Sequence, residues 1–304
     1  MEGASMSHVI TTEGLTKTYG SRTVVDGLDL RVPEGCVYGF LGPNGSGKST
    51  TMKMLLSLVR PTRGEISVLG RPVDHRTRHE LSPHIGSLIE APPGYGHLTG
   101  RENMAVVQRM LGSSDRQVAR AVEIVRLGEH MDKRVRDYSL GMKQRLGIAT
   151  ALARDPRLLV LDEPTNGLDP AGIEEIRELL VSLADRGITV MVSSHLLDEV
   201  DRMASVLGVL GRGRLIFQGT REELFDRSVP DLLVDTPEPE RALDLGLPAV
   251  RGPGGLRLSG FDDAATADLV RQLVHHEVPV HGVRRVRQSL EEVFMDLTGR
   301  EGLS

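Results

Sequence analysis

The sequence predicts an α/β fold that carries an inserted helical block and a small α+β appendage. Short apolar runs alternate with helical patterns over most of the chain, which is typical of strands that alternate with helices. A long middle section has only helical periodicity, and the pattern changes again after Gln218-Gly219-Thr220. With 304 residues, the chain is long enough for one large domain and a smaller one.

The first half supplies strands and one helix of the predicted core. Val24–Val32 alternates as a strand does, and Cys36–Leu41 is a compact apolar run. After Gly47 the apolar residues recur at helical spacing as far as Val59, and Pro61 closes this helix. Two further short strands are predicted after it, at residues 65–69 and 85–89.

The rest of the chain divides into a helical block, a return to strands and the appendage. Residues 99–154 predict helices with breaks near Gly112 and Gly128. Further strands are predicted at 158–161, 188–192 and 206–210, with a helix between the first two. We therefore predict a main domain over residues 8–223, with a helical subdomain at about 90–155, and a small α+β domain over residues 229–304.

Composition narrows the classes of function. The chain holds 37 basic and 42 acidic residues, a net charge of −5, which argues against a nucleic-acid binder with a broad basic surface. Cys36 is the only cysteine, so no intramolecular disulfide can form and a reducing cytoplasm fits best. No secretory signal is evident, and no apolar stretch approaches the roughly 20 residues that cross a bilayer. We expect a soluble, cytoplasmic chain with no membrane span of its own.

A glycine-rich segment follows the apolar run at 36–41 and fits the pattern G-x-x-x-x-G-K-[ST]. In such a loop, backbone N–H groups turn inward around phosphate oxygens, and the N-terminus of the next helix adds free donors. Lys48 can reach the β- and γ-phosphates, and the Ser49 hydroxyl can bind Mg²⁺. The alternative is a glycine turn before an ordinary helix. We predict that a nucleotide binds here, at Gly42, Pro43, Asn44, Gly45, Ser46, Gly47, Lys48, Ser49 and Thr50.

Two carboxylates, Asp162 and Glu163, end the apolar strand Leu158–Leu161. A strand that is buried on both faces has a continuous apolar sequence, and ligands collect where such strands end. Asp162 can hold Mg²⁺ through water, and Glu163 can polarise a water that attacks the γ-phosphate. In isolation the two residues would be solvated acids at the end of a strand. Because a phosphate-binding loop is also present, the two residues predict hydrolysis of the bound nucleotide.

The phosphate loop and the Asp-Glu strand together resemble the ATP-binding cassette of ABC transporters, over about Val9 to Glu223. The resemblance implies a RecA-like P-loop NTPase core with an antiparallel β subdomain and an inserted helical subdomain. It also implies that two copies dimerise head to tail, trap two ATP molecules with Mg²⁺ and hydrolyse them. The further partner would be a separate membrane permease. It would dock on the helical subdomain and hold the chain peripherally on the inner face of the cell membrane.

Residues 138–142 stand where the family carries Leu-Ser-Gly-Gly-Gln. Ser139 and Gly141 match this signature, whereas Leu140 and Met142 depart from it. By the resemblance, the helix that begins here directs its N-terminus at the γ-phosphate held by the other copy, although Ser139 would cap a helix in any protein. Asp169 resembles the aspartate of the family's D-loop, which crosses the dimer interface.

Two more residues take their roles from the resemblance. His195 resembles the switch histidine that contacts the γ-phosphate, while a lone histidine after a strand is more often structural. Tyr19 resembles the aromatic residue that stacks on adenine, and its alternative is a half-buried strand tyrosine.

Glu90 departs from the family, which carries glutamine at this position. Its carboxylate could coordinate Mg²⁺ or the attacking water, but it adds a negative charge beside the phosphates. Glutamate here, together with Tyr95 and Leu98-Thr99-Gly100, resembles a subgroup that exports or resists lantibiotic and bacitracin-like peptides. The tail segment 289–299 is similar to the C-terminus of drug-type exporter ATPases.

These resemblances predict the ATP-hydrolysing subunit of a transporter. We expect it to power export of, or self-resistance to, a peptide antibiotic or a similar amphipathic compound. The alternatives are the ATPase of a small-molecule drug exporter and a soluble ABC ATPase of translation or DNA repair. A P-loop enzyme of another family, such as a kinase, is a third.

Overall fold

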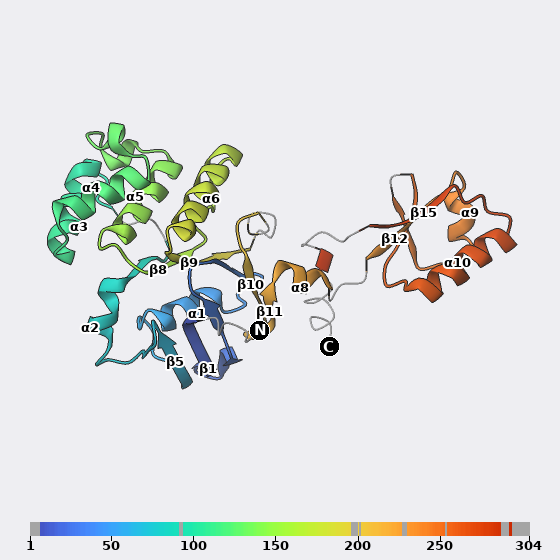
Figure 1. The fold of residues 1–304 in the computed structure, drawn as a ribbon, viewed down its shortest axis with the longest axis horizontal. Helices are drawn as coiled ribbons and strands as arrows, with labels where there is room; N and C mark the ends of the chain where they lie inside the picture. Colours follow the sequence, from blue (N-terminus) through green and yellow to red (C-terminus); the bar gives the residue numbers. More distant parts are fainter. Residues whose placement is uncertain are drawn as a thin grey trace, which may run out of the picture. The chain divides into compact units, whose positions relative to one another are not determined.

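The computed structural model describes residues 7–90, 94–195, 200, 202–226, 230–252, 254–286 and 292–293. The chain divides into two compact units, Met1–Thr220 and Arg221–Ser304. Each unit has its own sheets and its own core (Figure 1), so each is described by itself. Of the tail segment 289–299, only residues 292–293 lie within the described part.

A six-stranded sheet forms the centre of the first unit, in the order β11-β10-β4-β9-β8-β7. The strands are β4 (Val37–Leu41), β7 (Ile85–Leu88), β8 (Leu158–Asp162), β9 (Thr189–Ser194), β10 (Val206–Gly211) and β11 (Arg214–Thr220). Neighbours from β10 to β7 run parallel, and β11 is antiparallel to β10. Every residue of β4, β8 and β9 is buried, which explains their continuous apolar sequences.

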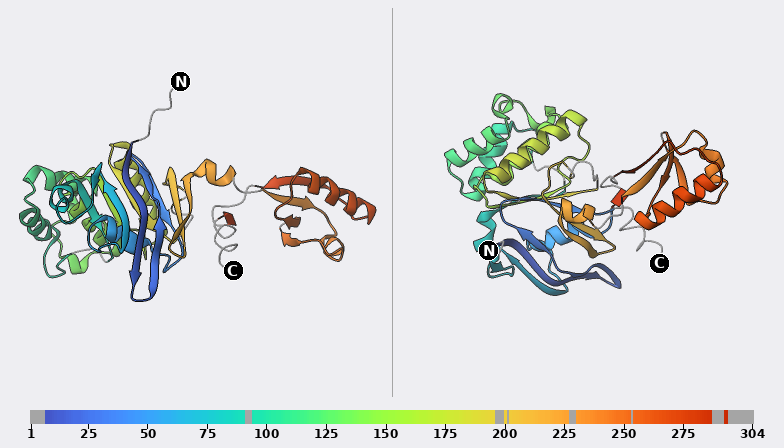
Figure 2. Two further views of the ribbon diagram at one scale, coloured as in Figure 1. Left: turned by 90° about the horizontal axis from the view of Figure 1, so that it is seen from below. Right: turned by 45° about the vertical axis from the view of Figure 1, so that its right-hand side comes forward.

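The helices α1 (Lys48–Leu55) and α6 (Pro170–Asp185) lie on opposite sides of this sheet (Figures 1 and 2). The sequence prediction that the first of them reaches Val59 is wrong. Ser57 adopts a left-handed φ of 57°, and the N–H groups of Leu58 and Val59 both donate to the carbonyl oxygen of Lys53, at 2.8 and 3.2 Å. This C-terminal cap turns the chain out of the helix.

An antiparallel sheet accompanies the core sheet, and β1 (His8–Tyr19) lies at its centre. The prediction of a single strand over 24–32 is wrong, because two strands are separated at Asp29 and Leu30. Thr12 Oγ1 donates to Leu28 O at 2.7 Å and accepts from Leu30 N at 2.8 Å, so one buried hydroxyl holds both sides of the break. The other strands are β2 (Arg22–Leu28), β3 (Arg31–Pro33), β5 (Arg63–Val68) and β6 (Arg71–Pro72).

Between β7 and β8 the chain forms the predicted helical block. Thr99 with Glu102 and Ser114 with Gln117 form reciprocal capping boxes at two of its helices. Ser139 caps a third, since its Oγ accepts from Met142 N at 3.2 Å. The helices are α3 (Gly100–Leu111), α4 (Asp115–Ile124) and α5 (Leu140–Leu152), with the shorter η2 (Gly128–His130) and η3 (Val135–Asp137). Two further short helices, α2 (Arg78–Leu81) and η1 (Ser82–His84), lie before β7 and outside this block.

The second unit is a four-stranded antiparallel sheet in the order β13-β14-β12-β15, with helices beside it. Strand residues such as Leu232 and Leu256 pack with Leu269 and Leu273 of the longest helix into a separate core. The elements are α8 (Arg221–Asp226), β12 (Asp231–Asp235), α9 (Pro239–Leu243), β13 (Ala249–Gly252), β14 (Gly255–Leu258), α10 (Asp263–His275) and β15 (Gly282–Val286).

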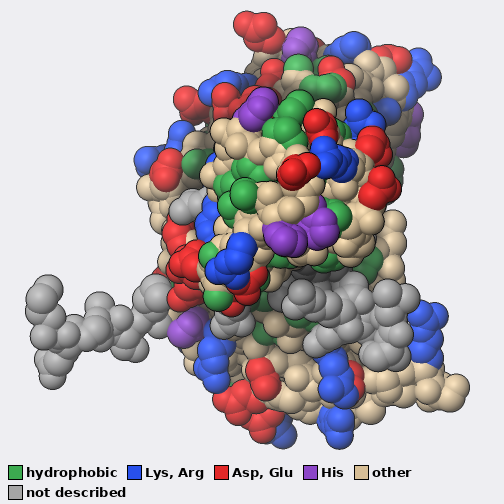
Figure 3. All heavy atoms as spheres, turned by 90° about the vertical axis from the view of Figure 1, so that its right-hand side faces the viewer, with side chains coloured by type: hydrophobic (Ala, Val, Ile, Leu, Met, Phe, Trp, Pro, Cys, Tyr) green, Lys and Arg blue, Asp and Glu red, His purple; other side chains and the backbone are tan. Residues whose placement is uncertain are grey.

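Charges of both signs are interspersed on the face shown in Figure 3, and neither sign gathers into one field there. Among the residues that the structure describes, no helix combines the length and apolar character needed to cross a membrane.

Helix α5 packs directly on β7, and this contact generates a test of the fold. A Cβ added at Gly86 would lie 2.2 Å from the carbonyl oxygen of Ala151, a backbone atom that cannot rotate away. We expect Gly86→Ala to destabilise the first unit by about 1–3 kcal/mol through overpacking. Gly128→Ala is the matched control, because nothing lies within 4 Å of its added Cβ. Denaturant unfolding followed by circular dichroism measures both, and equal midpoints would contradict the prediction.

Candidate nucleotide site

Four connections meet at one edge of the core sheet. The strands β4, β9, β8 and β7 are neighbours in that order and run parallel, so their carboxyl ends share this edge. The loop Gly42–Gly47 follows β4, His195 follows β9, Asp162 and Glu163 end β8, and Glu90 lies just beyond β7. The topology therefore brings together residues that are far apart in the sequence.

The loop from Gly42 to Gly47 is shaped by its own backbone. Gly47 has a φ of 105°, and a Cβ there would lie 2.7 Å from the carbonyl oxygen of Val24, so only glycine fits. Ser46 N donates to Pro43 O at 3.1 Å and closes the turn. The Oγ of Ser46 is buried and has no hydrogen-bond partner among the described residues. Such an orphan hydroxyl is costly, which fits a loop that a phosphate completes.

Lys48, the first residue of α1, is only 5% exposed. Its Nζ donates to Gly42 O at 2.7 Å and to Pro43 O at 3.3 Å. Burial lowers the pKa of Lys48, while the charges of Glu163 and Asp162 act in the opposite direction. The ammonium group thus lies at the loop with neutral carbonyls as its hydrogen-bond acceptors. An ionised phosphate would be a stronger acceptor than either of them.

Glu163 lies between two of the predicted site residues. Its Oε1 is 3.9 Å from Lys48 Nζ, and its Oε2 is 3.3 Å from His195 Nδ1. Asn166 Nδ2 donates to the same Oε2 at 3.4 Å. The backbone of Glu163 has a φ of 48°, in the left-handed region that non-glycine residues rarely adopt. Strain of this kind costs about 1–3 kcal/mol and persists where the surrounding structure imposes it, which is frequent at functional sites.

Ser193 fixes the other carboxylate, and the sequence analysis did not single it out. Its fully buried Oγ donates to Asp162 Oδ1 at 2.5 Å and accepts from Glu163 N at 3.0 Å. One hydroxyl on β9 therefore orients both acidic residues at the end of β8. A polar residue at the end of an otherwise apolar strand is the sequence signal that could have found it.

The side chains here suit Mg²⁺. Ser49, Asp162 and Glu90 offer a hydroxyl and two carboxylates, and hard oxygen donors are the ligands that this ion prefers. Within the described ranges, no group of three or more His, Cys, Asp or Glu side chains could hold a metal. An ion bound here would thus depend on phosphate and water oxygens as well, which is the usual mode for Mg²⁺.

Glu90 carries an ion pair that the sequence did not predict. Its Oε1 lies 2.5 Å from the Nζ of Lys53, in the last turn of α1. Hydrogen bonding to Lys53 lowers the pKa of Glu90, and the same bond raises the pKa of Lys53. Both groups are therefore charged near neutral pH. The sequence contains five lysines and predicted a chemical role for Lys48 alone.

Tyr19, at the end of β1, is 50% exposed. Lys17 Nζ lies 4.7 Å from the centre of its ring and donates to Arg60 O at 2.7 Å. An ammonium group over one face of an aromatic ring is a stabilising arrangement. A base would have to stack on the face that Lys17 leaves open.

The remaining predicted residues lie at helix starts. Ser139 caps α5, and Asp169 Oδ1 caps α6 by accepting from Gly172 N at 3.1 Å. In the described part of the chain, none of their hydrogen bonds reaches the Gly42–Thr50 loop. Gly141 lies beside Ser139, where an added Cβ would meet only Leu168 Cδ2, at 3.8 Å.

The fold and this edge together define a P-loop nucleotide hydrolase. The family described as ABC transporter matches residues 25–166. The bacitracin transport ATP-binding protein BcrA of Enterococcus faecalis is 38% identical over 98% of this chain and 99% of its own. The lantibiotic transport ATP-binding protein SrtF of Streptococcus pyogenes is 46% identical over 71% of this chain and 96% of its own.

A solved structure agrees with these relatives. That of cbiO1 from Clostridium perfringens, part of the ABC transporter complex cbiONQ, covers 72% of this chain and 91% of its own. It has a TM-score of 0.67 and 28% identity. The chain belongs to the ABC transporter family as an ATP-binding subunit, and it is an ATPase. The family and the P-loop cassette fold predicted from the sequence are confirmed, whereas the roles of single site residues stay predictions.

Ser193 generates a test of the site. We expect Ser193→Ala to lower ATP turnover about 10- to 100-fold, because Ser193 orients Asp162, a predicted metal ligand, and loss of such an orienting residue typically has this effect. Thr189→Val is the matched control on the same strand, since this fully buried hydroxyl accepts from Gly35 N at 2.9 Å, at the other end of β9. Steady-state phosphate release and thermal unfolding measure both variants. Equal turnover at equal stability would remove Ser193 from the site.

Proposed function

We propose that two copies of this chain close head to tail on two ATP molecules with Mg²⁺, and that hydrolysis powers export through a separate membrane permease. The observation that carries the proposal is the position of Glu163, held between Lys48 and His195 at the end of a buried strand. A carboxylate so placed can polarise a water for attack, while the lysine binds the phosphates.

The proposed chemistry divides among the residues of the sheet edge. Lys48 binds the β- and γ-phosphates, and Glu163 accepts hydrogen from the attacking water. His195, paired with Glu163, orients that carboxylate and contacts the γ-phosphate. Mg²⁺, held by Ser49 and Asp162 with Glu90 as the third candidate, would neutralise charge on the phosphates. Tyr19 would stack on the adenine ring.

The head-to-tail dimer draws support from the start of α5. Gly141 has a backbone conformation that residues with a side chain also adopt, and the surrounding chain leaves room for a Cβ at this position. A glycine that its own chain does not require suits close approach from outside, as by the phosphates bound to a second copy. Leu140 is 42% exposed beside it, at a surface that the second copy would cover. Ser139, Gly141 and Asp169 are therefore proposed to complete the partner's nucleotide site.

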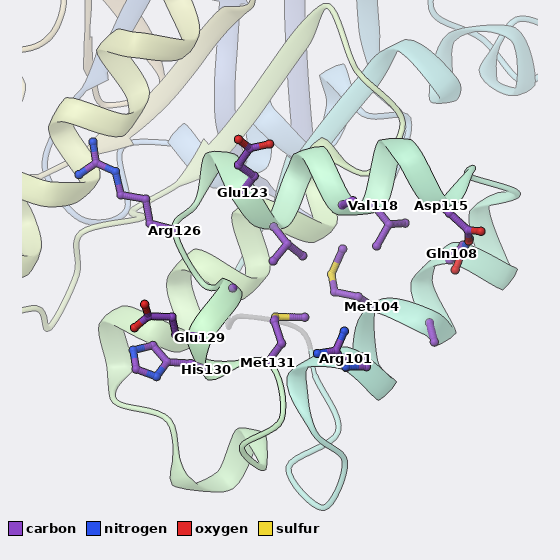
Figure 4. Close-up of a pocket in the computed structure, with 14 residues that line it drawn as sticks. Arg101, Met104, Gln108, Asp115, Val118, Glu123, Arg126, Glu129, His130 and Met131 are labelled. Atoms are coloured by element: carbon purple, nitrogen blue, oxygen red, sulfur yellow. The ribbon is translucent and has the colours of Figure 1, made fainter.

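The permease is proposed to dock on the helical block. A cavity of about 780 Å³ opens between α3 and α4 (Figure 4). Met104, Val118 and Met131 supply its apolar floor, while charged side chains such as Arg101 and Glu123 stand around it. An apolar floor inside a charged rim suits a short amphipathic helix from a cytoplasmic segment of the permease. The chain would then work at the inner face of the cell membrane.

The proposed cargo is a peptide antibiotic or a similar amphipathic compound, exported or resisted by the producing cell. BcrA and SrtF, which match most of the cassette, are bacitracin and lantibiotic transport proteins by name. Glu90, in place of the family's glutamine, and the sequence around it support the same subgroup.

Catalysis can be separated from binding at Glu163. We expect Glu163→Gln to lower turnover roughly 10²- to 10⁴-fold, the usual effect of removing a general base, while ATP still binds. Size-exclusion chromatography with ATP should then show a dimer. Lys48→Ala is the control that loses ATP binding. Wild-type turnover in Glu163→Gln would remove this residue from the chemical step.

The dimer has its own test. Ser139→Arg in the Glu163→Gln background should bind ATP but stay monomeric, because the long side chain obstructs the proposed surface of the partner. A dimer that persists with ATP in this double variant would contradict the head-to-tail arrangement.

Transport can be tested in cells that make the chain together with its permease. We expect tolerance to bacitracin or to a lantibiotic to rise, and Ala119→Glu, on the wall of the cavity, to abolish the gain and co-purification with the permease. Ala267→Glu is the control, since both alanines are exposed on helices and only the first lines the cavity. Tolerance to small hydrophobic drugs alone would contradict the proposed cargo.

A further inference from the structure

The ion pair between Lys53 and Glu90 joins two parts of the site. Lys53 lies on α1, the helix that begins at Lys48, and Glu90 lies in the connection that leaves β7. Their contact, 2.5 Å between Nζ and Oε1, therefore ties the phosphate-loop helix to the chain that enters the helical block. The hydrogen bond to Glu90 raises the pKa of Lys53, and the charge of Asp162 acts in the same direction.

Stability alone does not explain this pair. The side chains of Lys53 and Glu90 are 31% and 69% exposed, and exposed ion pairs contribute on the order of 0–1 kcal/mol. The pair has a larger effect on the net charge of the site than on the stability of the fold. Asp162 and Glu163 already bring negative charge to an edge that is proposed to bind a polyphosphate, and an unpaired Glu90 would add another.

We propose that Lys53 is a positioning residue that holds Glu90 by one oxygen and cancels its charge, so that the pair presents a carboxylate to the nucleotide site without a net negative charge. In the described part of the chain, Oε2 of Glu90 has no hydrogen-bond or ion-pair partner, and it is the oxygen left for a ligand. The pair is then electrostatically equivalent to a neutral glutamine while keeping a hard oxygen donor. This inference rests on the proposed nucleotide function of the site.

The expected change in nucleotide affinity on loss of the Lys53 charge follows from Coulomb's law. One unpaired charge about 10 Å from the phosphates, at an effective dielectric constant of about 40, changes affinity roughly three- to tenfold for each net charge on the ligand. Added salt screens such an interaction and reduces the change.

Charge swaps in the isolated full chain test the proposal, with a fluorescent ATP analogue as the probe. Lys53→Met should weaken binding of the analogue with Mg²⁺ roughly ten- to twentyfold, because this complex carries two net negative charges. Lys53→Arg should bind as the wild type does, because it keeps the charge. In buffer without Mg²⁺, where Glu90 has no metal to bind, Lys53→Met combined with Glu90→Gln should bind the analogue more tightly than Lys53→Met alone, since the added negative charge is gone. The deficit of Lys53→Met should shrink as sodium chloride is added.

Two outcomes would overturn the proposal. One is wild-type affinity in Lys53→Met under conditions where Lys48→Ala abolishes binding, which leaves the nucleotide function intact. The other is a double variant as impaired as Lys53→Met, with the same loss of helical signal by circular dichroism, which assigns Lys53 a structural role only. If the wild-type chain fails to bind the analogue at all, the proposed function fails with it.

Discussion

Parallel hydrogen bonding between β4, β9, β8 and β7 determines where the residues of the candidate nucleotide site lie. Each strand ends at the same edge, so the phosphate loop, His195, Glu163 and Glu90 meet there although long stretches of chain separate them. Three of these strands are buried along their whole length, and their parallel pairing sets which end of each lies at this edge. The helical block can be inserted between β7 and β8 without disturbing the edge, because both of its ends return to the same sheet.

A site of this kind must hold acidic groups beside an anionic ligand. Each carboxylate at this edge has a specific partner in the structure. Ser193 binds Asp162, Lys48 and His195 lie on either side of Glu163, and Lys53 binds Glu90. The left-handed backbone of Glu163 is part of the same solution, since it turns the chain at the point where β8 ends. Local backbone strain and paired carboxylates therefore occur together at this edge of the sheet.

The sequence predicted those parts of the fold and site that local patterns carry. The glycine spacing gave the loop, and apolar strands that end in polar residues gave Asp162 and Glu163. It missed Lys53, whose ion pair forms only when α1 meets the loop after β7. It also missed Ser193, which is marked as a polar residue at the end of an apolar strand but whose partner is set only when β9 pairs with β8. The predicted end of α1 was wrong for a similar reason. Apolar periodicity continues to Val59, but α1 ends at Leu55, where backbone N–H groups beyond the helix donate to Lys53 O.

Lysine is scarce in this chain, and its distribution follows the site. Of the five lysines, Lys17 lies over the Tyr19 ring, Lys48 lies at the phosphate loop and Lys53 holds Glu90, while Lys133 and Lys143 belong to the helical block. Three of the five lysine side chains thus lie at or beside residues predicted to bind the nucleotide. An acylating reagent that modifies amines but spares guanidinium groups would consequently report nucleotide binding through protection of Lys17 and Lys53, with the exposed Lys133 as an internal reference, and an arginine-rich background would leave these few sites easy to read by peptide mass.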